Sequence, residues 1–239
     1  VRERLNNPPE LSKAARANAV TARKILINME RWRWLPDDLG DLYIWNSLSE
    51  YETRVVRGGE VIHQERIIIG KPDTQTPVFS DKMQYLVFRP DWGVPNSIKV
   101  KQLLPALQSG RDSVLDARGM KIIINGRERK AYDYDWQRTD IRYIPVYQMP
   151  GPSNPLGQVK FMFPNKHDVY MHDTPQKYLF NDTRRAHSAG CIRVRDPKRL
   201  AELVMGIDQG WGMAEVNSVV HPRSKPINRI DLQRPIPVH

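Results

Sequence analysis

The sequence predicts a mainly β fold with peripheral α-helices and an α-rich insertion. Short runs of alternating or continuous apolar residues recur along much of the chain, and this pattern is typical of strands. Two segments, one near each end, instead repeat their apolar residues at helical spacing. Residues 92–143 interrupt the rhythm of the strands. The chain has 239 residues, of which 40% are hydrophobic, so it suits one large domain or a domain with an insertion.

The first forty residues predict a leader and one helix. Residues 1–10 are polar and contain Pro8 and Pro9, whereas residues 11–32 place apolar side chains at helical spacing. Pro36 ends any continuation. We expect Trp32 and Trp34 to anchor this helix on the rest of the protein. The chain therefore divides into residues 1–40 and a main domain, residues 41–239.

The main domain is predicted to contain most of the strands. They lie at residues 42–45, 51–56, 61–69, 83–88, 121–125, 158–163, 168–172 and 191–194. Gly58-Gly59 and Asn125-Gly126 are signals of hairpin turns. Helices are predicted at residues 97–107, 114–120, 197–205 and 211–219. Pro105 predicts a kink or an early end in the first of these, and Pro197 suits the first turn of the third.

The single cysteine and one histidine lie at the ends of two predicted strands. His172 closes the run 168–172, and Cys191 opens the run 191–194. Two strand ends on one rim of a sheet can meet although a polar loop separates them in sequence. A thiol beside an imidazole is a nucleophile with its base, because only the thiolate attacks well and the imidazole can take its proton.

The neighbours of Cys191 suit the same chemistry. Ser188, Ala189 and Gly190 are small, so the backbone can turn tightly and bring N–H groups near the sulfur. Such groups can hold the oxyanion of an acyl-transfer intermediate. Arg193 lies two residues past the cysteine, so in a strand both side chains point to one face. There its planar fork can bind a substrate carboxylate.

These residues resemble the catalytic motif of the L,D-transpeptidases (YkuD domain), in which a His, a loop and Ser-x-Gly-Cys with a nearby Arg or Asn carry the site. The matching positions are His172, residues 188–191 and Arg193. Many members have a second His directly before the Gly, where this chain has Ala189, and His187 lies two residues too early to replace it. A position that contributes its backbone N–H tolerates this substitution.

Other segments resemble the large Gram-negative subgroup of the family, whose members carry a capping insertion. The segments are residues 28–36, 70–72, 76–79, 154–157 and 160–161. The resemblance extends from about residue 22 to the C-terminus. It implies a YkuD-like β-sandwich catalytic core and a capping insertion at about residues 92–143, which we expect to act as a lid.

The resemblance implies an enzyme that cross-links peptidoglycan and needs no cofactor and no metal. Cys191 attacks a tetrapeptide donor stem at its third residue and expels D-alanine, and an amine of a second stem then gives a 3-3 link. His172 is the base, the carbonyl of Asp173 orients it, and Gly190 shapes the turn. The residues expected to bind substrate are Tyr170, Ser188, Ala189 and Arg193.

The implied partners are peptidoglycan stem peptides, carbapenem-type β-lactams as inhibitors, and other proteins of cell-wall synthesis. The implied place is the periplasm of a Gram-negative cell, with a part in cell-wall organisation and cell shape. The sequence has no targeting segment and begins with Val1 rather than Met, so we expect it to be a processed chain.

Several alternatives stay open. Water as acceptor gives an L,D-carboxypeptidase, a protein amine gives tethering of a protein to the wall, and a dead site gives a wall-binding protein. A lone cysteine is often a buried small hydrophobe. His167, His172, His187 and Cys191 are all zinc-ligand types, although their spacings match no common zinc motif.

The charge of the chain favours an anionic partner. Thirty-seven Lys and Arg residues against 27 Asp and Glu give a net charge of +10. The basic residues are scattered, and no recognition helix or RNA-binding signature accompanies them. We therefore expect no nucleic acid as a partner, and attribute the charge to solubility or to a cell-wall or membrane surface.

Overall fold

The computed structural model describes residues 12–239, which fall into a first unit that ends at Leu39 and a second unit, Gly40–His239. In the first unit, α2 (Lys13–Trp32) is the predicted helix. The predicted leader and the expected start of this helix at residue 11 lie outside the described residues. The docking of the helix through Trp32 and Trp34 stays a prediction. Among residues 12–239, no helix is both long enough and apolar enough to cross a bilayer.

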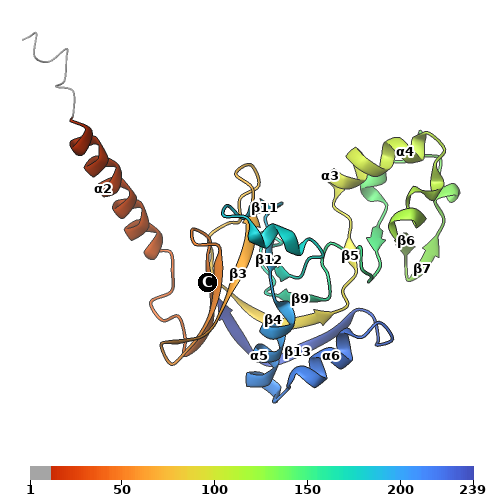
Figure 1. Ribbon diagram of the computed structural model, residues 1–239. Helices are drawn as coiled ribbons and strands as arrows, with labels where there is room; N and C mark the ends of the chain where they lie inside the picture. The colour runs from red at the N-terminus through yellow and green to blue at the C-terminus, as the bar shows by residue number, and fades with distance from the viewer. Residues whose placement is uncertain (1–11) are drawn as a thin grey trace, which may run out of the picture. The chain divides into compact units, whose positions relative to one another are not determined.

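The second unit is built on a nine-stranded sheet that curls until it meets itself. Its order is β11-β3-β12-β10-β9-β4-β13-β1-β2, and β2 pairs again with β3 (Figure 1). The strands are β1 (Leu42–Ser47), β2 (Glu52–Arg57), β3 (Glu60–Gly70), β4 (Asp81–Phe88), β9 (Val159–Met162), β10 (Met171–His172), β11 (Ala186–Ser188), β12 (Ile192–Val194) and β13 (Asn228–Val238). The fold is thus mainly β, as predicted.

Strand β3 joins the two parts of the curled sheet. Its first residues, from Glu60 to Arg66, pair with β2, and its last residues pair with β12 and β11. The turn before it, Gly58-Gly59, has φ angles of 58° and 79°. Both values lie in the left-handed region that the tight hairpin turn requires and that glycine adopts without strain.

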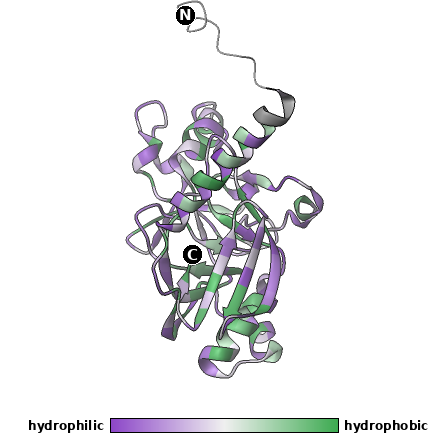
Figure 2. Ribbon diagram, turned by 90° about the vertical axis from the view of Figure 1, so that its left-hand side faces the viewer, coloured by the Kyte–Doolittle hydropathy of each residue, from purple (hydrophilic) through white to green (hydrophobic). Residues whose placement is uncertain are grey.

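Alternation along the strands places apolar side chains inside the curled sheet. In β4, Met83, Leu86 and Phe88 are fully buried, and in β9 Val159 and Phe161 are fully buried. The strands in Figure 2 accordingly change between hydrophobic and hydrophilic colours along their length. One face of the sheet therefore supplies the core, and the other is left for polar side chains.

Two helices near the C-terminus complete this core. Helix α5 (Pro197–Gln209) begins where the Asp196 side chain accepts a hydrogen bond from the backbone N–H of Arg199, at 3.1 Å. A side-chain acceptor at this position satisfies one of the free N–H groups of the first turn. Helix α6 (Met213–Val220) follows, and both helices bury apolar residues in the main core beside β13 (Figure 1).

Residues 92–148, which include the region expected to be an insertion (about residues 92–143), have a hydrophobic core of their own. The helical part runs through α3 (Asn96–Ile98), a π turn (Lys99–Leu103) and α4 (Leu104–Gln108). A four-stranded sheet, β5-β8-β6-β7, accompanies it; β6 matches the strand predicted at residues 121–125, whereas β5, β7 and β8 were not predicted. Its strands are β5 (Trp92–Gly93), β6 (Met120–Ile124), β7 (Arg127–Arg129) and β8 (Val146–Gln148).

The helical segments of the insertion differ from prediction in two places. The helix predicted to end or kink at Pro105 continues to Gln108, and the wide π turn directly precedes the proline. A wider turn accommodates a ring that lacks an N–H donor. The helix predicted at residues 114–120 is instead a pair of single 3-10 turns, Asp112–Val114 and Asp116–Arg118, followed by β6.

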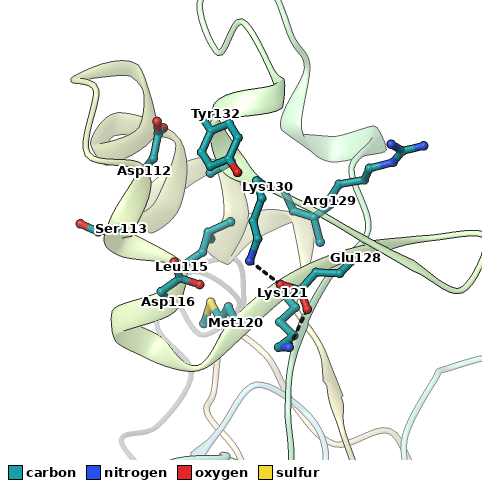
Figure 3. A pocket seen from close by; sticks show the side chains of 12 residues that line it. Asp112, Ser113, Leu115, Asp116, Met120, Lys121, Glu128, Arg129, Lys130 and Tyr132 are labelled. Atoms are coloured by element: carbon teal, nitrogen blue, oxygen red, sulfur yellow. Dashed lines mark hydrogen bonds and ion pairs between the residues drawn. The ribbon is translucent and has the colours of Figure 1, made fainter.

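A cavity of about 200 Å³ lies in the insertion between these turns and the β6–β7 hairpin (Figure 3). Glu128 reaches into it and pairs with Lys121 at 2.6 Å and with Lys130 at 2.7 Å. These two ammonium groups lower the pKa of Glu128 to about 2. The negative charge of Glu128 is therefore compensated by two lysines of the insertion.

One strand of the main sheet is also shorter than predicted. The run 168–172 was expected to be a strand throughout, but only Met171 and His172 pair as β10. Asn165 forms a turn before it, since its Oδ1 accepts the backbone N–H groups of His167 and Val169. Asp168 then has a φ of 54°, which lies outside the strand region.

Candidate active site

The site is organised by the parallel pairing of β10 with β12. Met171 is opposite Ile192, and His172 is opposite Arg193. Met171 and Ile192 are buried in the core, so His172 and Arg193 point to the other face. Cys191 directly precedes Ile192, just before the strand begins, and the groups that act on its thiol are Tyr170, Lys160 and Arg193. The pairing therefore sets the end of β10, which carries the predicted base, beside the start of β12, which the predicted nucleophile directly precedes.

His172 is held as a neutral imidazole. Its side chain is only 5% exposed, and its Nδ1 lies 2.5 Å from the carbonyl oxygen of Asp173. Because a carbonyl can only accept, Nδ1 carries the proton and Nε2 is left with a free lone pair. Burial, followed by the charges of Arg193, Lys160 and Lys177, lowers the pKa of His172 to about 3. The ring is thus ready to accept a proton at neutral pH.

Cys191 is partly exposed and carries a protonated thiol at rest. Burial of the sulfur raises its pKa above the ordinary value, and the neighbouring groups Tyr170, Lys160 and Arg193 oppose that rise. The Sγ atom lies 3.8 Å from the carbonyl oxygen of Asp168, a weak contact for a thiol donor. Burial therefore favours the neutral form of both groups, the thiol of Cys191 and the imidazole of His172.

The turn before Cys191 is fixed by hydrogen bonds from inside the protein. The Ser188 hydroxyl donates to the carbonyl of Cys191 at 2.6 Å and accepts the N–H of Gly190 at 3.1 Å. Gly190 has a φ of 128°, a value that favours glycine. Ser188 is thus buried within the turn, whereas Ala189 is exposed beside it. Ser188 and Ala189 were both expected to bind substrate, but only Ala189 presents its side chain to solvent.

The loop that contains Thr74 and Thr76 supports the same turn, although the site prediction did not include this loop. The Thr76 hydroxyl donates to the carbonyl of Gly190 at 2.7 Å and accepts the N–H of Gly70 at 2.9 Å. The Thr74 hydroxyl donates to the carbonyl of Ser188 at 3.2 Å. These contacts join β3 to the nucleophile turn across more than a hundred residues of sequence. The family resemblance included residues 70–72 and 76–79 but gave them no role in the site.

Asp173 is fixed through its carboxylate, and its carbonyl is thereby fixed on His172. One carboxylate oxygen accepts the N–H of Gln158 at 2.8 Å, and the other lies 2.6 Å from the Lys177 ammonium. Gly157 makes room for this carboxylate. A Cβ atom at Gly157 would lie 2.2 Å from Oδ2 of Asp173, and the φ of Gly157 is 60°. Gly157 is therefore a second glycine that the site requires.

Arg193 has a neutral partner, and the structure gives it no carboxylate within the described residues. Its Nη1 donates to Oε1 of Gln176 at 2.8 Å, and its buried Nε has no hydrogen-bond partner. The two acids that could have held it as structural partners are engaged elsewhere. Asp173 pairs with Lys177, and Asp182 pairs with Nε2 of His187 at 2.8 Å. The guanidinium is therefore available to an anion from outside.

Tyr170 and Lys160 complete the polar face. The rings of Tyr170 and His172 lie 5.6 Å apart between centroids. The ammonium of Lys160 lies 4.0 Å from the centroid of the Tyr170 ring. Lys160 was not among the predicted site residues. Its position two residues into β9, opposite His172, is a consequence of strand pairing that the sequence pattern does not reveal.

Two other histidines, His187 and His167, have partners of their own. His187 is bound to Asp182, and the His167 ring packs 5.1 Å from the ring of Phe79. Within the described part of the chain, no three His, Cys, Asp or Glu side chains gather where they could hold a metal ion. The four residues considered as zinc ligands are therefore not brought together as a set.

Comparison with known proteins places this geometry in a family. A sequence model of the L,D-transpeptidase catalytic domain, YkuD, matches residues 41–221. A curated Haemophilus influenzae protein, described as a candidate L,D-transpeptidase, is 26% identical over 219 residues. The match covers 92% of this chain and 44% of that protein, so the chain spans less than half the length of this relative.

Solved L,D-transpeptidase structures are also similar. They include the avibactam carbamoyl enzyme of Ldtfm (12% identity, TM-score 0.38, 84% of this chain and 49% of that chain) and an L,D-transpeptidase in complex with imipenem (14%, 0.37, 83% and 59%). An enzyme from Mycobacterium smegmatis is 12% identical with a TM-score of 0.36, over 83% of this chain and 58% of that chain. The family match covers most of the chain and includes the whole His172–Cys191 site. The chain therefore belongs to the YkuD family of L,D-transpeptidase catalytic domains.

Proposed function

We propose that this protein is a peptidoglycan L,D-transpeptidase that forms 3-3 cross-links through a thioester on Cys191. The observation that carries the proposal is the β10–β12 pairing, which sets His172 opposite Arg193, two residues past Cys191, and so supports an imidazole that acts on this thiol. A nucleophile beside an oriented base is the arrangement that acyl transfer needs.

The first half-reaction forms the acyl-enzyme. The Cys191 sulfur attacks the carbonyl carbon of the third residue of a tetrapeptide stem, and its proton passes to Nε2 of His172. The tetrahedral intermediate then collapses, the bond to the terminal D-alanine breaks, and the departing amine takes the proton back from the imidazolium. The Asp173 carbonyl keeps Nδ1 protonated throughout, because it can only accept a hydrogen bond.

The nucleophile turn supports the oxyanion. The N–H of Gly190 already donates to Ser188, so the donor that we assign to the oxyanion is the N–H of Cys191 itself. Ser188 and Thr76 hold the peptide groups of the turn in place before the substrate arrives. Ala189 lies exposed at the turn, where the donor backbone passes it, and Arg193 binds a carboxylate of the donor.

The second half-reaction consumes the thioester. The amine of a second stem attacks, gives its proton to His172, and displaces the thiolate, which takes that proton. Water in place of the amine gives an L,D-carboxypeptidase, and a protein amine gives tethering to the wall. We place the reaction in the periplasm, where peptidoglycan is made, and expect carbapenem-type β-lactams to acylate the same sulfur.

Mass spectrometry of the products tests the proposal. Purified tetrapeptide stems and the protein should yield free D-alanine and a stem dimer whose link joins two third residues. A tripeptide without dimer would show that water is the acceptor. No consumption of stems by protein that binds them would reject catalysis and leave the wall-binding alternative.

We also assign the insertion, residues 92–148, to a lid over the substrate, in agreement with the resemblance to the capping subgroup. Replacing the β6–β7 hairpin by a short Gly/Ser linker should weaken binding of large cell-wall fragments. Alkylation of Cys191 by iodoacetamide should persist or quicken, because access improves. A stable variant with unchanged kinetics on intact stems would show that the insertion has no such role.

A further inference from the structure

We propose that Lys160 forms a second anion-binding position beside Cys191, which holds one carboxylate of the donor stem while Arg193 holds another. The inference rests on the proposed transpeptidase function and adds a requirement on its substrate. The donor must carry two carboxylates close to the bond that breaks.

Strand pairing places the two cations on either side of the base. Lys160 on β9 is opposite His172 on β10, and His172 is opposite Arg193 on β12. The three residues form one row across the sheet, on the face away from the core. Since neighbouring strands lie about 4.8 Å apart, the two cationic residues start about 10 Å apart.

The two side chains then extend in opposite directions along β10. The Lys160 ammonium lies over the Tyr170 ring, one row toward Cys191, with 4.0 Å to the ring centroid. The Arg193 guanidinium instead reaches Gln176, which follows β10 beyond His172. A substrate whose scissile carbonyl meets Cys191 is therefore bordered by a positive charge at each side.

Neither cation has an anionic partner within residues 12–239. The ion pairs of this region include the nearby Lys177–Asp173 pair but none with Lys160 or Arg193. Lys160 is half-buried, and this burial lowers the pKa of its ammonium, while Cys191 as a thiolate and then Asp91 oppose the shift through their fields. Burying a cation without a counter-ion is costly, so an unpaired lysine beside the nucleophile is best explained by an anion that arrives with the substrate.

The chemistry of a tetrapeptide stem meets this requirement. Its terminal D-alanine carries a carboxylate next to the scissile amide. A third residue that is a diamino diacid, such as diaminopimelate, carries another on its side chain. Two carboxylates that border one amide bond match two cations that border one thiol. Both contacts would be hydrogen bonds between charged groups, which are stronger than hydrogen bonds between neutral groups.

Kinetics with three donors tests the assignment. The donors are an unmodified stem, a stem amidated at the terminal carboxylate, and a stem amidated at the side-chain carboxylate. Lys160→Gln should lower kcat/KM about 10- to 100-fold on the unmodified stem, mainly through KM, which corresponds to the loss of one charged hydrogen bond. The penalty should vanish on one of the amidated stems and persist on the other. The stem on which it vanishes identifies the carboxylate that Lys160 binds.

Two matched variants control for charge and folding. Lys160→Arg keeps the charge and should keep most of the activity. Lys82→Gln removes a charge from an exposed lysine of β4 and should change nothing. If Lys160→Gln does not fold, wild type gives the test alone, because amidation of either carboxylate should then cost a similar factor.

An equal penalty of Lys160→Gln on all three stems would overturn the assignment. The pH dependence of iodoacetamide alkylation would then show whether Lys160 acts on the thiolate instead. Unchanged kinetics of Lys160→Gln, with wild type active, would also overturn it while leaving the transpeptidase proposal intact. A wild-type protein that turns over none of the stems would overturn both.

Discussion

Replacing Gly157 by alanine tests how the protein holds its catalytic histidine. The φ of Gly157 is 60°, and an added Cβ would meet Oδ2 and Cγ of Asp173 at 2.2 and 2.3 Å. An alanine in the left-handed region costs about 1–2 kcal/mol by itself. Displacing the carboxylate breaks at least one charged hydrogen bond, worth about 1.5–3 kcal/mol. The free energy of unfolding should therefore fall by about 2.5–5 kcal/mol.

Gly126 provides a matched control. Its φ is 74°, but no atom lies within 4 Å of the position of an added Cβ. In Gly126→Ala the free energy of unfolding should therefore fall by only about 1–2 kcal/mol, the cost of placing an alanine in the left-handed region. Urea unfolding of both variants measures the difference. Activity should fall in Gly157→Ala alone, because only there does the carbonyl that orients His172 shift.

A double-mutant cycle checks the cause. Once Asp173 is alanine, the carboxylate that would collide with the new Cβ is absent, so Gly157→Ala should cost no more than Gly126→Ala. Residues in direct contact are the ones whose effects fail to add. Equal costs of Gly157→Ala with and without the Asp173 side chain would refute this explanation of the site.

Three further predictions concern the polar face. His172→Ala should slow acylation about 10²–10⁴-fold as the general base is lost, whereas His187→Gln should change it little; a crippled His187→Gln would identify the wrong base. The pKa of His172 is about 3 in the folded protein and 6.5 when unfolded, so the unfolded state binds more protons between these values. From pH 3 to 6.5 the free energy of unfolding should therefore rise more steeply in wild type than in His172→Gln, by about 1.4 kcal/mol per pH unit. Urea unfolding at several pH values measures both slopes, and equal slopes would contradict this prediction. Arg193→Lys keeps the charge but loses the fork, so kcat/KM should fall by about 1–3 kcal/mol with little change in Tm, and a large loss of Tm with normal kinetics would make Arg193 structural.

Much of this site follows from local sequence pattern. His172 and Cys191 could be placed because each lies at an end of an alternating run, and Arg193 could be assigned to the face of the thiol because strand side chains alternate. The glycine at position 190 was a local signal too. These inferences need only the period of a strand and a turn.

The residues that support the site could not be found in this way. Thr76 reaches Gly190 from a loop 114 residues earlier, and Lys160 meets His172 only because β9 pairs with β10. The role of Gly157 depends on the position of the Asp173 carboxylate. Pairing partners and registers are set by the whole sheet, and no short window of sequence contains them.

Within the site, the local pattern was wrong about the length of one strand. The run 168–172 alternates, yet Asn165 holds the backbone in a turn and the strand begins only at Met171. The shortened strand still ends at His172. The end of the strand at His172 was therefore predicted although its length was not.

The central claim is that Cys191 carries the acyl group, and intact-mass spectrometry tests it most directly. The protein is mixed with a tetrapeptide stem whose acceptor amine is blocked, and the reaction is stopped with acid within the first turnovers. Wild type should gain the mass of the donor less that of D-alanine, with the adduct on the peptide that contains Cys191. Cys191→Ala should gain nothing while remaining folded. An adduct on the alanine variant, or release of D-alanine by that variant, would contradict the account.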